Sequence, residues 1–312
     1  MRAGSGPYGF VLAFALALTA CAPHAPAAAD AAASAYAYDD TKHLVALVDA
    51  AAAAIHADGL TSACAQFAQK NSRWYFGQYY LFVYALDGTA VCHAASPNLV
   101  GKHLMGLRDM NGKPIVRFIT DIGKRPQADA SGWVFYLWQE QSQLGPSWKS
   151  AYLRKVTAGG TTYVVGSGLY QMRTEKAWVQ ERVDAAAALL ASKGEKAAFA
   201  QFEDPASPFV FNDTFVFVLD ARGRTLVDPA YPTMAGRDLA DFRDAVGNRP
   251  VAAAMRALQR ADATWMQYLW PAPGSGEPTR KLIYLRKVVV DGKTLYVGTD
   301  LFLATPIWMR AG

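Results

Sequence analysis

The sequence has few of the residues that build metal centres, disulfide frameworks or nucleic-acid interfaces. Three cysteines and five histidines in 312 residues are too few for a disulfide scaffold or a cysteine-rich zinc site. The net charge is only +5 and the chain has no basic run, which argues against binding to DNA or RNA. The G-x-S-x-G, H-E-x-x-H, Walker and C-x-x-C motifs are all missing. We therefore expect no nucleic-acid partner, no metal, no cofactor and no enzymatic activity.

The first twenty residues have the pattern of a secretory signal. Arg2 is the only charge before the apolar run Phe10–Leu18, which is shorter than the roughly 20 residues that span a bilayer. The run ends in Leu18-Thr19-Ala20-Cys21, which resembles the lipobox of bacterial lipoproteins. This resemblance implies a signal peptide over residues 1–20 and lipidation at Cys21. The alternative is an ordinary secreted protein in which Cys21 is incidental.

A lipidated Cys21 would hold the protein on the periplasmic face of a bacterial membrane. Ala22 directly after the cysteine favours the outer membrane over the inner one, by analogy with other lipoproteins. Residues 21–39 are rich in alanine with scattered proline, which is typical of a tether.

The rest of the chain is an internal repeat. The segment Trp133–Trp138 matches Trp265–Trp270, and Lys149–Val156 matches Lys281–Val288. So many aromatic residues in register predict two homologous domains, over residues 40–173 and 174–306. In the second copy the positions of Cys64 and Cys92 are taken by other residues, Phe199 and Val227. This favours two small buried hydrophobic residues, with a disulfide between them left open.

Each copy has the periodicity of an α+β domain on an antiparallel sheet. The alanine-rich segment Leu44–Ile55 predicts a helix, and Trp178–Ala191 is its counterpart in the second copy. A hairpin over 79–93, a short helix over Pro114–Gly123 and three further strands follow. Both faces of the strand Trp133–Trp138 are apolar. We therefore expect covering elements on both sides of the sheet.

Several short motifs recur at matching places in the two copies. In the first copy they are Phe82-Val-Tyr84, Asp87-Gly88, His93, Gly101-Lys102, Gly112-Lys113-Pro114, Gly132 to Trp138, Lys149, Tyr152 and Tyr163 to Gly168. In the second they are Phe217 to Asp220, Gly223, Asp228-Pro229, Gly236, Trp265, Tyr268, Trp270, Lys281, Tyr284 and Gly298. Together they resemble the single Cache domain of bacterial extracytoplasmic sensors over nearly all of residues 40–302. The resemblance implies two PAS-like domains, each a long helix packed on a five-stranded antiparallel sheet.

The resemblance also implies a ligand pocket between each sheet and its covering loops, for a small organic molecule and often a short carboxylate. The expected ligand-binding residues combine aromatic walls with hydrogen-bond donors and a positive charge: His93, Tyr136, Trp138, Lys149 and Tyr152, with Tyr268, Trp270, Lys281 and Tyr284 in the second copy. Strand parity puts Lys149 and Tyr152 on opposite faces, so their joint use would need a bulge.

The two copies differ at the expected site. His93 is replaced by Asp228, and Gly168 by Asp300, which would place a carboxylate where the first copy has bare backbone. We therefore expect the two pockets to bind different ligands. The hypothesis is a lipid-anchored binding or sensory protein that recognises a short organic acid and relays the signal to a membrane partner, because no kinase, cyclase or chemotaxis output domain is recognised in the chain. The alternative is an envelope protein–protein interaction module with no small-molecule ligand.

Overall fold

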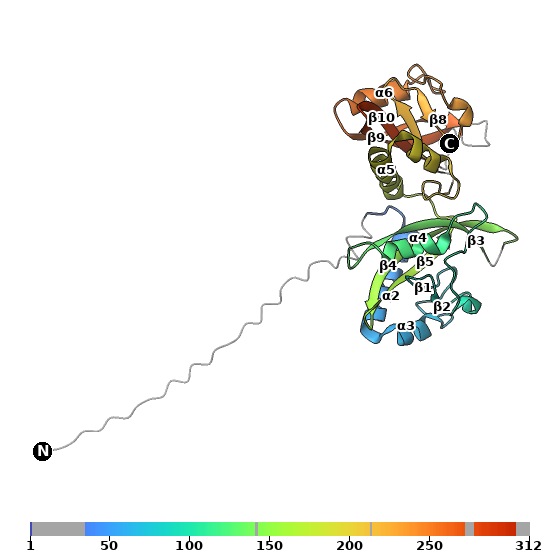
Figure 1. Cartoon of the computed structure of the whole chain (residues 1–312), viewed down its shortest axis with the longest axis vertical. Helices are drawn as coiled ribbons and strands as arrows, with labels where there is room; N and C mark the ends of the chain where they lie inside the picture. The colour runs from blue at the N-terminus through green and yellow to red at the C-terminus, as the bar shows by residue number, and fades with distance from the viewer. Residues whose placement is uncertain (2–34, 141–142, 213, 272–277, 304–312) are drawn as a thin grey trace, which may run out of the picture.

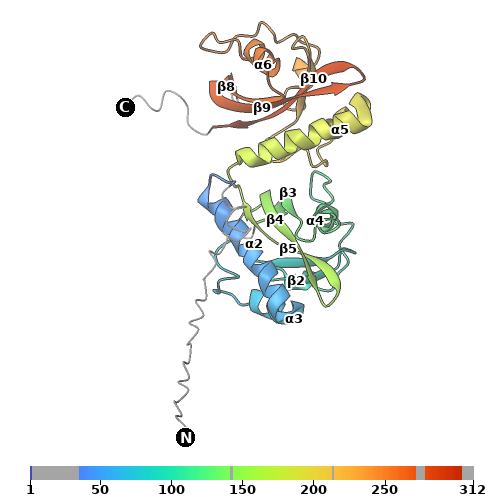
Figure 2. The same cartoon turned by 90° about the vertical axis from the view of Figure 1, so that its left-hand side faces the viewer.

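A computed structural model describes residues 1, 35–140, 143–212, 214–271 and 278–303 of the chain. Two five-stranded antiparallel sheets follow one another along the chain (Figure 1), and a long helix lies between them (Figure 2). The expected α+β class is confirmed. The predicted signal peptide (1–20), Cys21 and most of the tether (21–39) lie outside the described residues.

In chain order, two helices precede the first sheet and a third lies between its second and third strands. Its strand order is β2-β1-β5-β4-β3. The elements are α2 (Asp39–Asp58), α3 (Leu60–Phe67), β1 (Phe82–Ala85), β2 (Ala90–His93), η1 (Pro97–Leu99), α4 (Ile115–Gly123), β3 (Ser131–Gln139), β4 (Pro146–Ala158) and β5 (Thr161–Tyr170).

The second half repeats this arrangement with strand order β7-β6-β10-β9-β8. Its elements are α5 (Lys176–Glu203), β6 (Phe217–Asp220), β7 (Thr225–Val227), η2 (Pro232–Met234), α6 (Pro250–Leu258), β8 (Ala263–Pro271), β9 (Pro278–Val290) and β10 (Lys293–Phe302). Both long helices are interrupted at equivalent glycines, Gly59 between α2 and α3 and Gly194 inside α5, where φ is 79° and 74°. Only glycine adopts such φ values without steric cost, so the helical layer bends at the same place in both copies.

Both faces of the first sheet are covered, as the apolar strand pattern predicts. Trp133 and Phe135 pack on the α2 side, whereas Val134 and Tyr136 pack on the α4 side. Figure 2 shows α2 and α4 on opposite sides of this sheet. Side chains alternate between faces along a strand, so two separate cores form, and the α4 side is the one that holds the cavities described below.

The structure joins Cys64 on α3 to Cys92 on β2 by a disulfide, with the two Cα atoms 5.8 Å apart. The sequence analysis favoured two small buried hydrophobic residues and left the bond between them open, and the structure has the bond. The element that brings the two cysteines together is α3, a helix that the sequence did not predict. This helix begins directly after the bend at Gly59 and carries Cys64 over the edge strand of the sheet.

We expect replacement of both cysteines (Cys64→Ala with Cys92→Val) to lower the unfolding free energy of the first domain by about 3 to 4 kcal/mol. The sequence separation of 28 residues defines the loop that the bond closes in the unfolded chain. Urea denaturation with and without reductant measures the change. The second domain carries Phe199 and Val227 at these places, so its transition is the internal control. An unchanged first transition would contradict the prediction.

Contacts at the junction bind the two halves together. The Glu175 carboxylate, just before α5, accepts hydrogen bonds of 2.9 Å from the backbone N–H groups of Ala37 and Tyr38, at the start of α2. Trp178 of α5 packs in the core on the α2 side of the first sheet. The expected boundary at 173/174 stays a proposal, and this core includes Trp178 and Phe211 from beyond it.

The buried Lys113 also reaches across the junction. Its ammonium donates a hydrogen bond of 2.7 Å to the carbonyl of Ser207 and another hydrogen bond to the carbonyl of Val210. Burial lowers the pKa of Lys113 to about 7. The linker after α5 is thus held to the loop before α4.

Candidate ligand-binding sites

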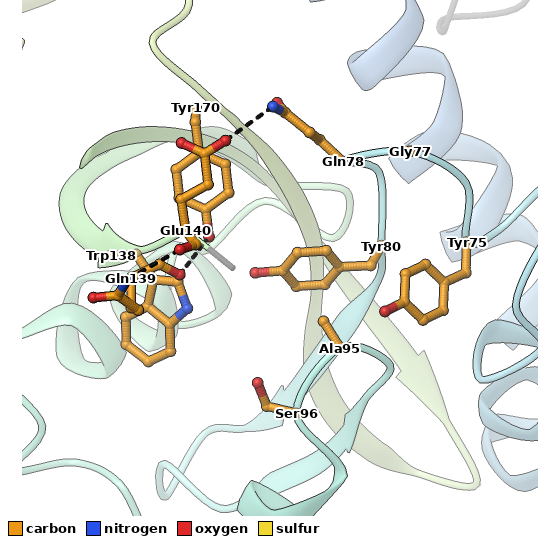
Figure 3. A pocket seen from close by; sticks show the side chains of 10 residues that line it. All are labelled: Tyr75, Gly77, Gln78, Tyr80, Ala95, Ser96, Trp138, Gln139, Glu140 and Tyr170. Carbon is orange, nitrogen blue, oxygen red and sulfur yellow. Dashed lines mark hydrogen bonds between the residues drawn. The ribbon is translucent and has the colours of Figure 1, made fainter. Parts of the chain in front are cut away.

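Two adjoining cavities lie on the α4 side of the first sheet. The outer cavity has a volume of about 440 Å³, in the range typical of small-molecule sites. The inner cavity, of about 10 Å³, has room for about one water molecule. Tyr80 and Trp138 line both cavities. Figure 3 shows the Tyr80 ring pointing across the outer cavity toward Trp138 and Tyr170.

Lys149 lies directly behind Tyr80 and is 1% exposed. Its ammonium donates a hydrogen bond to the Tyr80 hydroxyl and lies 5.1 Å from the centroid of the Tyr170 ring. Within the described residues, no acidic side chain forms an ion pair with Lys149. Burial lowers the pKa of Lys149 to about 7, because the charged form loses its hydration. As far as the structure describes the first domain, it therefore holds a buried cation without a counterion beside a cavity.

His93, at the end of β2, lines the inner cavity. Its Nδ1 accepts a hydrogen bond of 3.0 Å from the backbone N–H of Ser96. Burial, together with the positive charge of Lys149, lowers the pKa of His93 to about 4. The ring is therefore neutral near pH 7 with its proton on Nε2, which makes Nε2 a hydrogen-bond donor to an anion.

The rim of the outer cavity is tied together by polar contacts. The Gln78 amide donates a hydrogen bond of 3.2 Å to the Glu140 carboxylate, which is visible in Figure 3. The Tyr170 hydroxyl donates 3.1 Å to the carbonyl of Gln139. The sequence analysis did not select Tyr80, Gln78, Glu140 or Tyr170. Tyr80 precedes β1, and only its place in the aromatic run before this strand hinted at a role.

The predicted aromatic residues divide between the two faces of the first sheet. Tyr136 pairs with Lys149 across β3 and β4 and lines the inner cavity with Trp138. Tyr152 pairs with Trp133, and their ring centroids lie 5.3 Å apart in the core under α2. The register of β4 is continuous between Lys149 and Tyr152, so no bulge brings them together. The structure therefore does not place Tyr152 at either cavity.

In the second domain the equivalent lysine has a carboxylate partner. The Lys281 ammonium forms an ion pair of 2.6 Å with Asp300 of β10, and both side chains are buried. Asp300 counteracts the effect of burial and holds the pKa of Lys281 above its ordinary value. Tyr268 and Trp270 line the cavity together with Lys281. Tyr284 instead packs against Trp265 on the helix side of the sheet, with the ring centroids 5.1 Å apart.

The second cavity has a volume of only about 40 Å³. Tyr231 stands where the first domain has the small residue Ser96, and it packs against Trp270 with ring centroids 5.6 Å apart. Its hydroxyl donates 2.7 Å to the carbonyl of Pro271. A bulky side chain thus closes the space that is open in the first domain.

Two pairs of equivalent contacts establish the correspondence between the sites. The Ser167 hydroxyl donates a hydrogen bond of 2.8 Å to the carbonyl of Tyr80. In the same way, the Thr299 hydroxyl donates a hydrogen bond of 2.6 Å to the carbonyl of Phe215. Tyr231 N–H donates 3.1 Å to the Asp228 carboxylate, as Ser96 N–H does to His93. Phe215 therefore replaces Tyr80, which means that the hydroxyl partner of the lysine is lost in the second domain and Asp300 takes its role.

Two further properties concern the described residues only. No group of three or more histidine, cysteine or acidic side chains in them is placed to hold a metal ion. None of their helices combines the length and apolar character needed to cross a membrane.

Both halves of the chain match Cache domain family models. The Cache domain model dCache_2 matches residues 60–128 and 80–175, and the model for single Cache domain 2 matches residues 184–301. The chain therefore contains Cache domains, which form a non-catalytic family of sensory ligand-binding modules. None of the curated proteins matches the chain.

Solved structures of sensor domains are similar to parts of the chain. The periplasmic sensor domain of a chemotaxis protein is 28% identical, with 47% of this chain and 94% of that chain covered and a TM-score of 0.34. A methyl-accepting chemotaxis protein from Vibrio parahaemolyticus is 19% identical, with 45% and 89% covered and a TM-score of 0.32. A structure titled as the basis for carboxylic acid recognition by a Cache chemosensory domain is 17% identical, with 40% and 85% covered and a TM-score of 0.32.

Proposed function

We propose that this protein is a lipid-anchored extracytoplasmic sensor whose first domain binds a short organic acid. The observation that carries the proposal is Lys149, a buried ammonium that donates a hydrogen bond to the neutral hydroxyl of Tyr80. A buried cation without a counterion is costly, and an anionic ligand would offset that cost. The second domain supports this view, because the equivalent Lys281 has an internal carboxylate, Asp300, as its partner.

The carboxylate of the ligand would lie where the two cavities meet. There it would accept hydrogen bonds from Lys149 Nζ and Tyr80 Oη, with His93 Nε2 as a further donor from the inner cavity. The outer cavity would hold the rest of the molecule against Trp138. Glu140 at the rim would repel the anionic end and so orient it inward.

The signal would leave the domain through its covering elements. The segment between β2 and α4 contributes Ala95 and Ser96 to the outer cavity and Leu107 to the inner one, so a ligand where the two cavities meet would order this segment. The start of α2 is tied to Glu175, which precedes α5. A small shift of α2 would thus reach the second domain, and we propose that a membrane-bound signalling partner detects it. Cys21 would keep the protein on the periplasmic face of a membrane, with the outer membrane preferred.

A thermal-shift panel of short carboxylates tests the ligand class. We expect at least one monocarboxylate or dicarboxylate to raise the melting temperature of the first domain, because a ligand that binds only the folded state stabilises it. The variant Tyr136→Phe should weaken this effect, because Tyr136 lines the inner cavity. The matched control is Tyr152→Phe, on the same sheet but in the core under α2, and it should respond as the wild type does.

The outcome that contradicts the proposal is a panel in which no carboxylate stabilises the wild type, or in which Tyr136→Phe and Tyr152→Phe respond alike. In that case the chain would act through its outer surface as an envelope interaction module. A stoichiometric protein partner, captured independently of any small molecule, would then be expected.

A further inference from the structure

The cavity of the second domain is chemically distinct from that of the first. It lies between the sheet and α6, with apolar walls and a group of polar side chains. Phe242 and Trp270 form part of the wall, with their ring centroids 4.8 Å apart. Asp228, Lys281 and Thr225 also line it. These three side chains decide which ligand the cavity can accept.

The charged groups at this cavity do not balance. Lys281 is committed to Asp300 at 2.6 Å. Asp228 accepts a hydrogen bond from the backbone N–H of Tyr231, and among the described residues it has no ion-pair partner. One ammonium therefore faces two carboxylates, which leaves one excess negative charge. Burial raises the pKa of Asp228, Lys281 lowers it and Asp300 raises it further. The rise has burial as its main cause, because a carboxylate that leaves water loses its hydration.

Thr225 is a second and independent sign of a ligand. Its side chain is 1% exposed, and among the described residues its hydroxyl has no hydrogen-bond partner. Thr225 pairs with Leu219 across β6 and β7, so it belongs to the face of the sheet that lines the cavity. The first domain has Ala90 at this place, where no polar group is present. A buried hydroxyl without a partner is costly, and a ligand would satisfy it.

The size of the cavity limits the ligand. Its volume of about 40 Å³ corresponds to about three water-sized positions, hence a ligand of about three or four non-hydrogen atoms. The Lys281 ammonium already lies 5.5 Å from the centroid of the Trp270 ring, and an aromatic ring of this kind stabilises a positive charge because its face is negative.

We propose that the cavity of the second domain binds a small primary amine, whose ammonium group would donate to the Asp228 carboxylate and whose polar end would bond to Thr225. The two domains would then bind ligands of opposite charge. This inference is independent of the first site, because it rests only on residues of the second domain.

Isothermal titration calorimetry with three small probes tests the proposal. Ethanolamine and ethylene glycol have four non-hydrogen atoms each and differ in charge, so charge separates these two. Glycolate, with five non-hydrogen atoms, is the anionic probe. We expect ethanolamine to bind the wild-type protein, with at least tenfold weaker binding to Asp228→Asn and severalfold weaker binding to Thr225→Val. Ethylene glycol should bind far more weakly than ethanolamine, and Lys149→Met should bind ethanolamine as the wild type does.

The variant Asp300→Asn provides a second, independent measurement. It removes one of the two carboxylates, so the excess negative charge disappears and Lys281 loses its counterion. We expect weaker binding of ethanolamine and new binding of glycolate at this site. Melting curves without ligand check that each variant is folded.

The proposal is overturned if ethanolamine does not bind the wild type at millimolar concentration. It is overturned equally if ethanolamine binds wild type and Asp228→Asn with the same affinity, or if glycolate binds the second site of the wild type more tightly. Loss of carboxylate binding at Lys149 would contradict the proposed function of the first domain and leave this result unaffected.

Discussion

Replacing Lys149 by methionine is expected to stabilise the protein while it abolishes carboxylate binding. Methionine fills a similar volume without a charge. The pKa of Lys149 is lowered from 10.5 to about 7 by burial, so at pH 7 and below the folded state carries the cost of a desolvated ammonium. Removing it should raise the unfolding free energy by roughly 2 to 4 kcal/mol, after allowance for the lost hydrogen bond to Tyr80. Affinity for the anion should fall at least a hundredfold.

The matched control is Lys281→Met at the equivalent place in the second domain. This change leaves Asp300 buried without its partner, so it should lower the unfolding free energy by about 3 to 5 kcal/mol. Denaturant unfolding and calorimetry measure both variants. If both variants change the unfolding free energy in the same direction, the two lysines have the same environment. That result would contradict the claim that Lys149 is a buried cation without a counterion.

The stability gain of Lys149→Met also has a defined pH dependence. Between about pH 7 and 10.5 the folded protein binds fewer protons at Lys149 than the unfolded protein does, so the wild type becomes more stable as pH rises. The advantage of the variant should therefore shrink over this window.

The second large effect is a loss of carboxylate affinity at alkaline pH. Only the protonated Lys149 attracts an anion, and its pKa in the free protein is about 7. Above that value the competent fraction falls tenfold for each pH unit, so the affinity should fall by about a hundredfold between pH 6 and 9. Titration calorimetry at several pH values, in buffers of different ionisation enthalpy, should also show uptake of about one proton at pH 8 to 9.

His93 allows this step to be assigned. Its pKa is lowered to about 4, so it stays neutral over the whole window and contributes no step near pH 6. A midpoint near 6.5 that disappears in His93→Gln would assign the proton to the histidine and reject Lys149 as the source of charge. A pH-independent affinity would reject the whole electrostatic account.

Much of the architecture could be predicted from the residue pattern. The repeat, the α+β class, the helix on each sheet and the apolar character of both faces of β3 are consequences of local periodicity. The same periodicity placed Lys149 and Tyr152 on opposite faces, and the register of β4 agrees. Strand parity is a local property, so it survives folding unchanged.

The partners of the buried groups could not be predicted in this way. Tyr80 lies 69 positions before Lys149, and nothing in the local pattern of either residue indicates that they meet. The disulfide depended on α3, whose existence follows from the bend at Gly59. The closure of the second cavity depended on Tyr231, which lies in a loop and reaches Trp270 only in the folded chain.

By itself the sequence determined that the chain is duplicated, that each copy presents one lysine from the same strand position, and that only the second copy has an aspartate in place of Gly168. The tertiary structure alone decided that Asp300 reaches Lys281 and that Lys149 donates to the neutral hydroxyl of Tyr80. The physical reason is that electrostatic pairing depends on distances of a few ångströms between strands. Sheet pairing sets those distances, and residue order along the chain does not.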